Sequence, residues 1–336
     1  MIGQETRDTE RKITAILKVL SDSGNPLGGR VISRRLKERG VDLNERTVRY
    51  HLKMMDERGL TRSIGQRDGR TITEPGLEEL KSALVIDKVG FVAGRIGLLA
   101  YLTTFDPEGL AGDIPVDVSL FTKAQFADAW DIMRDVFASG FCTSNLVAIA
   151  SSGERLGDVV VPPGKMGMAT VCSAAIVGTL LKAGIPIDSR FGGLLQIRNH
   201  EPARFVELIE YSGCTLDPFQ IFVAGIMTNV TGAVKMGEGK VLAGFYEVPF
   251  PSRSATEAVI NKFKAFKLCQ FILSGTSSQP VCDVPARSDK VSLVLPSGLN
   301  AVAAVAEKGL DVRCRPLSGV MEVGKLRSFW SLSSTG

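Results

Sequence analysis

The sequence has few of the residues on which most metal sites and acid–base catalysts depend. Its 336 residues include six cysteines and two histidines. The cysteines stand far apart without C-x-x-C spacing, so the sequence predicts no metal site. Reduced thiols in the cytoplasm are the simplest interpretation of such scattered cysteines.

Long apolar runs are also missing. The longest uncharged segments, 136–153 and 218–234, are interrupted by Ser, Asn, Gln and Gly, unlike a helix that faces lipid. The first twelve residues, MIGQETRDTERK, place no apolar stretch before their charges and therefore do not resemble a signal peptide. We expect a cytoplasmic protein that does not contact a membrane.

The common catalytic and nucleotide-binding motifs are absent as well. Gly164-Lys165 is followed by Met166, so no P-loop is formed, and Gly237-x-Gly239 fails as a dinucleotide fingerprint at Leu242. The serines lack a nucleophile elbow, and two histidines leave little for proton transfer. The sequence therefore predicts a protein that is not an enzyme, with no catalytic residue and no cofactor.

Charge is distributed unevenly along the chain. The net charge is +4, and apolar residues make up 44% of the chain, an ordinary globular balance. Residues 1–81 hold 17 Lys and Arg against 13 Asp and Glu, whereas residues 82–336 hold 23 of each. The whole excess thus lies in a small basic head attached to a neutral body, which favours a head that binds a polyanion.

The head has the pattern of a winged helix-turn-helix. Apolar residues at helical spacing, Ile13 to Leu20, predict a first helix. A shorter helix ends at Gly40, and Asn44 offers an N-cap to a third helix that ends near Arg58. The β-prone runs 60–64 and 71–73 flank a glycine-bounded basic tip and predict a hairpin.

The third helix would enter the major groove and the hairpin would serve as the wing. Val48, Leu52 and Met55 fall on one side of this helix, and most of its basic residues fall on the other. The predicted DNA-binding residues are Arg46, Thr47, Arg49, Tyr50 and Lys53 on the helix and Arg67 and Arg70 on the wing. Two alternatives stay open: a solvated charged face without a ligand, and a winged helix that binds another protein.

The body, residues 82–336, contains a weak internal duplication in two halves, about 88–200 and 218–325. Phe91-Val92-Ala93-Gly94 recurs as residues 222–225, and each half follows a strand with a capped helix. A small-residue helix then ends at Gly184 in one half and at Gly309 in the other. We predict an α+β fold, with an α/β regulatory domain built from two similar halves behind the winged helix.

The segments FVAGRIGLLAYLTTFDPEGLAG, VVVPPGKMGMATVCSAAIVGTLLKAGIP, SRFGGLLQI and PSGLNAVAAVAEKGLDV, which follow a winged helix, resemble the NrpR family of transcriptional repressors. The resemblance runs from about Arg11 to about Lys325. It implies a repressor that binds palindromic operators of nitrogen-assimilation genes as an oligomer and is released by 2-oxoglutarate. Some members carry two regulatory domains, and this chain has room for one.

If this chain binds 2-oxoglutarate itself, two carboxylates need cations or N–H donors. The segments 189–193 and 228–232 have the pattern of polar glycine turns, which can hold an anion or only reverse the chain. The candidate effector-binding residues are Lys165, Arg190, Gly192, Gly193 and Arg198. In the second half, Arg315 comes near the Arg190 position, and Asn300 comes close to where Lys165 aligns.

Reading a palindromic operator requires at least two heads. We therefore expect double-stranded operator DNA as the partner of a homodimer or a higher even oligomer that is joined through the body. Two other functions stay open from sequence alone: an enzyme with an accessory winged helix, and a protein-interaction adaptor.

Overall fold

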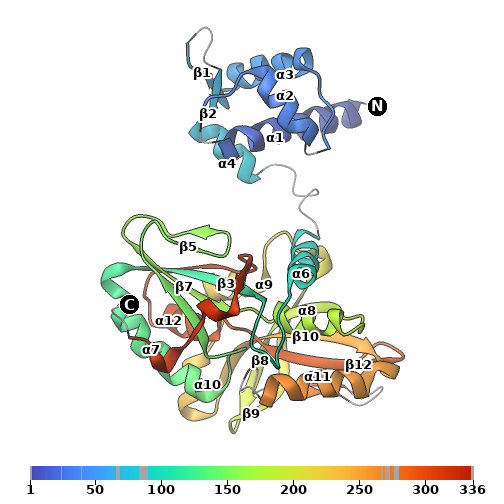
Figure 1. Ribbon diagram of the computed structural model, residues 1–336, viewed down its shortest axis with the longest axis vertical. Helices are drawn as coiled ribbons and strands as arrows, with labels where there is room; N and C mark the ends of the chain where they lie inside the picture. The colour runs from blue at the N-terminus through green and yellow to red at the C-terminus, as the bar shows by residue number, and fades with distance from the viewer. Residues whose placement is uncertain are drawn as a thin grey trace. The chain divides into compact units, whose positions relative to one another are not determined.

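The computed structural model describes residues 2–23, 25–38, 40–65, 69–82, 90–265, 268, 273–275 and 280–333. The chain forms two compact units, Met1–Lys88 and Val89–Gly336 (Figure 1). The first unit contains the head, and the second contains the described part of the body. Within the described residues, no helix is long and apolar enough to cross a membrane.

The head contains the predicted helices and hairpin. Its helices are α1 (Ile2–Ser23), α2 (Gly29–Glu38) and α3 (Glu45–Glu57), and strands β1 (Thr61–Ser63) and β2 (Arg70–Ile72) pair antiparallel. Ile13, Leu17 and Leu20 of α1 are buried against α3, as their helical spacing predicts. The order of helices and hairpin matches the predicted winged helix.

A fourth helix of the head, α4 (Glu74–Ser82), was not predicted from the sequence. The Thr73 hydroxyl accepts a hydrogen bond from the Gly76 amide at 3.1 Å and thereby caps the start of α4. Gly76 must lack a side chain, because a Cβ there would lie 2.1 Å from the Leu60 carbonyl oxygen. The signal for this helix was the order Thr-Glu-Pro, since proline is favoured in the first turn after a threonine cap.

The body contains two mixed layers of sheet and helix. One sheet has the strand order β13-β3-β7-β4-β15, and β14 also pairs with β3 in this sheet. The other sheet has the order β11-β12-β10-β8-β9. The strands of the first sheet are β3 (Asp113–Thr122), β4 (Leu146–Ala150), β7 (Lys165–Val171), β13 (Val312–Arg315), β14 (Val320–Glu322) and β15 (Arg327–Ser328). The strands of the second are β8 (Asp188–Arg198), β9 (Glu201–Glu210), β10 (Gly239–Pro249), β11 (Leu273–Ser274) and β12 (Lys290–Pro296). A small hairpin is formed by β5 (Arg155–Leu156) and β6 (Val159–Val160).

The two halves of the body exchange their last strands. Strand β8 ends the first half but pairs with β10 of the second half, and β13 and β14 end the second half but pair with β3 of the first. Each sheet is therefore completed by the other half. The registers also show which positions correspond, because Lys165 pairs with Thr122 just as Lys290 pairs with Pro249.

This register corrects one alignment made from the sequence. The residue that corresponds to Lys165 is Lys290, at the start of β12, and Asn300 lies beyond that strand at the start of a helix. The sequence alignment failed because Lys165 lies at the start of β7, whereas Asn300 lies beyond the end of β12, the strand that corresponds to β7.

The helices of the body exchange partners in the same way. Helix α8 (Ala174–Lys182) packs on α6 (Phe91–Leu102) and on α11 (Arg253–Ala265) of the other half. Helix α12 (Asn300–Glu307) packs on α9 (Pro218–Ala224), on α10 (Val230–Met236) and on α7 (Phe126–Ser139) of the first half. Figure 1 shows α7, α10 and α12 gathered on one side of the body, with α8 and α11 on the other.

Small side chains allow α8 and α12 to lie between these layers. Ala174 to Leu180 in α8 and Asn300 to Val305 in α12 are buried throughout. The two main apolar clusters of the body each contain residues from both sheets. The mixed helix and sheet architecture with two similar halves is as predicted.

Candidate functional site

The third helix presents most of its predicted DNA-binding side chains to solvent. The Asn44 side chain caps α3 by accepting a hydrogen bond from the Thr47 amide at 2.9 Å. Val48, Leu52 and Met55 are completely buried, and this fixes the orientation of the helix on the head. The exposed side chains of the opposite face are Arg46, Arg49, Tyr50 and Lys53. Thr47 is half-buried, and its hydroxyl donates to the Asn44 side chain at 3.0 Å.

Arg49 forms an exposed ion pair with Glu45 that DNA can replace. Its guanidinium lies 2.6 Å from the Glu45 carboxylate, one turn earlier on the same exposed face. Such exposed pairs contribute only about 0.3–0.5 kcal/mol, so a phosphate or a guanine edge can replace Glu45 at little cost. The stem of Arg49 crosses Gly29, where a Cβ would lie 3.1 Å from the Arg49 Cγ.

His51 belongs to the core of the head. The residue is 5% exposed, and its Nδ1 has no hydrogen-bond partner among the described residues. Burial, together with the charge of Lys12, lowers the pKa of His51. His51 is therefore neutral near pH 7 and packs beneath Tyr50 rather than facing a ligand.

The wing contributes less than the sequence suggested. Arg67 lies outside the described residues. Arg70 donates from Nε to the Asp56 carboxylate of α3 at 2.7 Å, and its backbone bonds to Leu27 in both directions. Arg70 thus joins the hairpin to α3 and to the segment before α2, and its guanidinium is already paired with a carboxylate.

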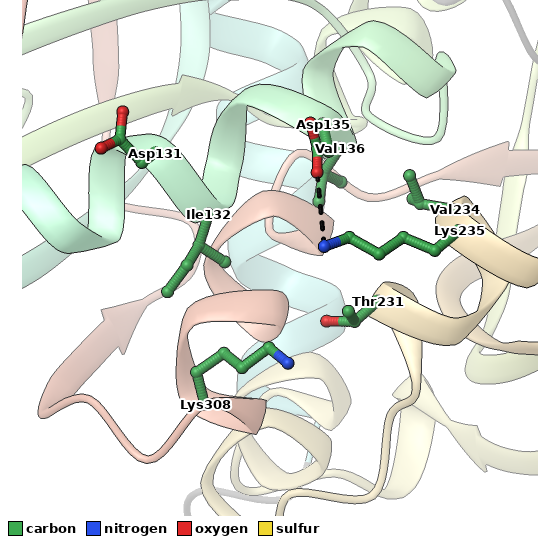
Figure 2. Close-up of a pocket in the computed structure, with 8 residues that line it drawn as sticks. All are labelled: Asp131, Ile132, Asp135, Val136, Thr231, Val234, Lys235 and Lys308. Carbon is green, nitrogen blue, oxygen red and sulfur yellow. Dashed lines mark ion pairs between the residues drawn. The ribbon is translucent and has the colours of Figure 1, made fainter.

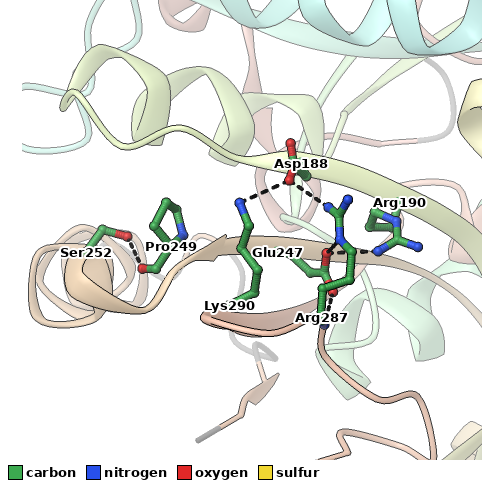
Figure 3. A network of polar contacts seen from close by, with 7 residues as sticks. All are labelled: Asp188, Arg190, Glu247, Pro249, Ser252, Arg287 and Lys290. Carbon is green, nitrogen blue, oxygen red and sulfur yellow. Dashed lines mark hydrogen bonds and ion pairs between the residues drawn. The ribbon is translucent and has the colours of Figure 1, made fainter. Parts of the chain in front are cut away.

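In the body, Arg190 contacts a buried carboxylate. Glu247 of β10 has a completely buried side chain, and Arg190 of β8 donates to it at 2.9 Å. Arg287 donates to Glu247 from its Nε at 2.5 Å and from its backbone amide at 2.8 Å. Arg287 and Lys290 also hold Asp188, at 2.7 and 3.2 Å. Figure 3 shows this group, which we call the Glu247 cluster: Asp188, Arg190, Glu247, Arg287 and Lys290.

The Glu247 cluster balances burial against charge. Burial alone would raise the pKa of the Glu247 carboxyl, but the hydrogen bonds from Arg287 and Arg190 outweigh it, and the pKa lies below its ordinary value. Three cations face two carboxylates, so the cluster carries one surplus positive charge. Asp188 is half-exposed, so a dissolved carboxylate can reach its partners. Arg287 and Lys290 were not predicted from the sequence, because they lie some 90 residues beyond the motif that contains Arg190.

Lys165 is also paired within the chain. Its ammonium lies 2.6 Å from the Asp311 carboxylate and 3.0 Å from the Thr122 hydroxyl. The hydrogen bonds from Lys165 and Thr122 lower the pKa of Asp311. Lys165 corresponds to Lys290, and each lysine pairs with an aspartate of an exchanged strand. Lys165 pairs with Asp311, which directly precedes β13, and Lys290 pairs with Asp188, which begins β8.

The predicted effector residues do not come together as one site. Gly192 and Gly193 were expected in a turn, but they lie inside β8 and pair with Gly244 and Ala243 of β10. Both are glycines for packing reasons: a Cβ at Gly192 would meet Pro218 at 2.8 Å, and a Cβ at Gly193 would meet the Glu207 carbonyl at 2.6 Å.

Arg198 cannot share a small ligand with Arg190. Arg190 lies near the start of β8 and Arg198 is its last residue, so at about 3.3 Å per residue they stand roughly 26 Å apart. The turn that follows is formed by Asn199 and His200, both with positive φ, as in a tight two-residue hairpin.

The glycine turn at 228–232 binds a carboxylate of the chain itself, that of Glu307. The Glu307 carboxylate, at the end of α12, accepts from the Thr228 hydroxyl at 2.7 Å and from the Val230 amide at 2.6 Å. It also accepts from the amide and the hydroxyl of Thr231, at 3.0 and 2.8 Å. These bonds fasten α10 to α12. No local pattern predicts Glu307 as the anion, because it lies 76 residues after Thr231.

A cavity of about 250 Å³ lies beside Thr231, one of the residues that bind Glu307 (Figure 2). Its lysines are Lys235, which lies 3.7 Å from Asp135, and Lys308. Asp131 also lines the cavity. Because acids and bases are equal in number there, the cavity has no electrostatic preference for an anion.

Several titratable groups of the body are buried. Burial raises the pKa of Cys142 and of Cys314 to about 12, which leaves both thiols unreactive near neutral pH. Burial raises the pKa of Asp117 to about 6 and that of Asp217 to about 7. Asp217 caps α9 by accepting from the Phe219 amide, and Asp117 accepts from the Leu317 amide. Among the described residues no group of acids, histidines and cysteines is placed to hold a metal ion.

Comparison with known proteins gives a family match for each of the two units. Residues 89–328 match the family described as NrpR regulatory domains NRD1 and 2, and residues 14–80 match the Ribonuclease R winged-helix domain. A relative named global nitrogen regulator NrpRI, from Methanosarcina mazei, is 37% identical over 93% of this chain and 96% of that protein.

Longer relatives and one solved structure complete the comparison. Proteins named global nitrogen regulator NrpR from Methanococcus maripaludis and Methanocaldococcus jannaschii are both 30% identical over 88% and 95% of this chain. The chain spans about half of their length, 51% and 55%. A crystal structure of a nitrogen repressor-like protein from Methanococcus jannaschii has a TM-score of 0.59 at 22% identity and covers 70% of this chain and 97% of its own.

Proposed function

Because the chain belongs to the NrpR family of nitrogen regulators, we propose that it represses nitrogen-assimilation genes by binding their operators through α3. At the coarser level it is a nitrogen-related transcriptional regulator with a winged-helix head. Its relatives are named as regulators, which is consistent with a role without catalysis. The protein acts in the cytoplasm, where its operators are.

The observation that carries this proposal is the two-sided character of α3. Its inner face is anchored by fully buried residues, whereas Arg46, Arg49, Tyr50 and Lys53 all face solvent on the outer side. A rigid helix with cations and a tyrosine on one face is what contact with bases and phosphates requires. Thr47 completes this surface from the first turn, and Arg67, which lies outside the described residues, stays a proposed DNA contact of the wing.

Operator binding by two heads requires an even oligomer. Recognition helices of two protomers must lie about 34–36 Å apart to read successive major-groove faces. The neutral body is the part suited to joining protomers, because the head is too highly charged for a wide dry interface. We propose a homodimer as the binding unit.

The effector in this proposal is 2-oxoglutarate, which binds at the Glu247 cluster. Arg287 and Lys290 already hold one carboxylate, the half-exposed Asp188, and the cluster has one cation in excess. A ligand carboxylate can replace Asp188, while Arg190 stays on Glu247. Loss of operator affinity by 100-fold needs about 2.7 kcal/mol of coupling, and DNA must then weaken 2-oxoglutarate binding equally.

The first prediction separates base contacts from phosphate contacts on α3. Arg49→Ala should weaken specific binding by about 1–3 kcal/mol and relax the preference at one base pair. Lys53→Ala should weaken binding to all sequences alike and reduce the slope of log affinity against log salt by about one. Gel-shift titrations over a salt series measure both, and wild-type affinity in both variants would exclude α3 as the recognition helix.

The second prediction concerns the effector. Lys290→Ala should weaken 2-oxoglutarate binding by about 10- to 100-fold, because a hydrogen bond to a charged group is worth about 1.5–3 kcal/mol. Arg198→Ala is the matched control at the other end of β8 and should leave the affinity unchanged. Calorimetric titration of the full chain decides. Absence of heat at millimolar ligand would place sensing in a partner protein, and equal affinity in Lys290→Ala would remove the cluster from this role.

A further inference from the structure

Helix α6 has apolar residues on both of its sides, and its one charged residue, Arg95, donates to the Leu317 carbonyl oxygen and to the Asp158 carboxylate. Val92, Ile96, Leu99 and Ala100 are buried against the body. On the outer side Phe91 is 63% exposed and Tyr101 is 68% exposed, with Leu98 and Leu102 also open to solvent. A surface helix normally turns polar residues outward, so this composition indicates a second packing partner.

The outer side of α6 is shaped for a close neighbour. A Cβ added at Gly94 or at Gly97 would meet no atom within 4 Å, so the two glycines leave a shallow open strip between Phe91 and Tyr101. Leu181 of α8 extends the apolar surface, and the Lys182 ammonium lies 5.0 Å from the centre of the Tyr101 ring. Figure 1 shows α6 and α8 side by side. We call this surface the α6 face: Phe91, Gly94, Leu98, Tyr101, Leu102 and Leu181.

We propose that the α6 face is the dimer interface, in which α6 packs antiparallel on α6 of a second copy of this chain. Glycines allow two helices to approach closely, and axes of packed helices lie about 8–10 Å apart. In an antiparallel pair, Tyr101 of each copy lies against Phe91 of the other, and the glycine strips meet at the centre. A two-fold axis requires the same patch on both copies.

The exposed area supports a second copy as the occupant. Full burial of a phenylalanine or tyrosine removes about 150–250 Å² from water, so the exposed parts of Phe91 and Tyr101 alone amount to roughly 200–330 Å². The three leucines add to this area. The apolar centre therefore supplies a large part of the about 800 Å² per partner that a standard interface buries.

Charge at the two ends of α6 favours the antiparallel arrangement. Lys182 lies at the Tyr101 end, where its ammonium sits over the ring. At the other end, the Ser212 carbonyl lies 3.5 Å from where a Gly90 Cβ would be, and Glu210 is exposed two residues before it. Antiparallel packing brings Lys182 of each copy toward Glu210 of the other, and this opposite-charge contact occurs twice.

This inference deepens the proposed function and rests on it for its biological role, because a dimeric body supplies the two heads that an operator needs. Helix α6 is also the first helix described in the body, after α4 of the head ends at Ser82. Pairing at α6 therefore fixes the points from which the two chains continue toward their heads.

The test uses the full chain and sedimentation over a range of concentrations. The wild type should be a dimer, and Leu98→Asp should raise the dimer dissociation constant by 100-fold or more. Met236→Asp is the matched control, because Met236 is 69% exposed outside the α6 face, and it should remain dimeric. Circular dichroism confirms that each variant is folded.

A charge exchange makes the test specific for the antiparallel geometry. Lys182→Glu should weaken the dimer by about tenfold, and adding Glu210→Lys should restore it. A monomeric wild type, a Leu98→Asp variant that dimerises like the wild type, or a double variant weaker than Lys182→Glu alone would each overturn the proposal. Gel shifts on the same samples separate the two claims. A dimer that depends on Leu98 but ignores the operator contradicts only the proposed function, and operator binding by a dimer indifferent to Leu98 contradicts only the α6 face.

Discussion

Val48→Asp should abolish specific operator binding while the body stays folded. Val48 is completely buried between the helices of the head, and a carboxylate placed there has no cation to pair with. The cost of burying an unpaired charge is several kcal/mol or more. A small domain has a total stability of about 5–15 kcal/mol, so the head should unfold or lose its fixed packing.

The matched variant is Val48→Ala, which removes two methyl groups and introduces no charge. It should lower the stability of the head by about 1–3 kcal/mol and leave the outer face of α3 intact, so operator binding at low temperature should persist. Thermal unfolding, in which the head and the body are expected to melt in separate steps, measures the stability of the head in both variants. Gel shifts measure their operator binding. Normal binding by Val48→Asp would mean that DNA contact does not depend on the packed position of α3.

Removal of both arginines from Glu247 should strongly destabilise the body. The double variant Arg190→Met with Arg287→Met leaves a completely buried carboxylate with only the Arg287 amide as a donor. Breaking a buried ion pair on one side typically costs about 3–5 kcal/mol. Replacing Glu247 by leucine as well should recover most of this loss, because exchange of a whole buried ionic group for apolar residues is often close to neutral.

The pH dependence of the double variant should reverse in sign. In the wild type the pKa of Glu247 is lowered, so its contribution to stability is complete above the unfolded value of about 4.3 and is lost as pH falls through the folded pKa. Without the arginines, burial raises that pKa, and stability should instead rise as pH falls through it. Urea unfolding between pH 4 and 8 measures this. Equal stability of the wild type and the double variant at pH 7 would contradict the role given to the cluster.

Local patterns in the sequence predicted the head well. The spacing of Ile13 to Leu20 and of Val48, Leu52 and Met55 predicts helices whose buried faces the structure confirms. Asn44 is the cap that its residue type indicates. These predictions succeed because helix periodicity and capping depend on neighbours within one or two turns.

Contacts between distant segments could not be predicted in the same way. The pattern of β8 predicts a strand, but nothing local states that it pairs with β10 of the other half, and Gly192-Gly193 was therefore mistaken for a turn. The partners of Arg190 follow from that pairing, since Glu247 stands 57 residues away in sequence. Glu307 similarly reaches the 228–232 turn only after α12 has packed on α10. A buried carboxylate needs hydrogen-bond donors, but only the fold determines which residues supply them.

The most direct test of the central claim is a footprint of the full chain on genomic DNA from upstream of nitrogen-assimilation genes, with and without 2-oxoglutarate. The account predicts protection of palindromic sites whose half-sites lie one helical turn apart, lost at millimolar 2-oxoglutarate and shifted to higher protein concentration in Arg49→Ala. Protection that is uniform along the DNA, or that is absent at every site under low salt, would contradict the assignment of this chain as an operator-binding repressor.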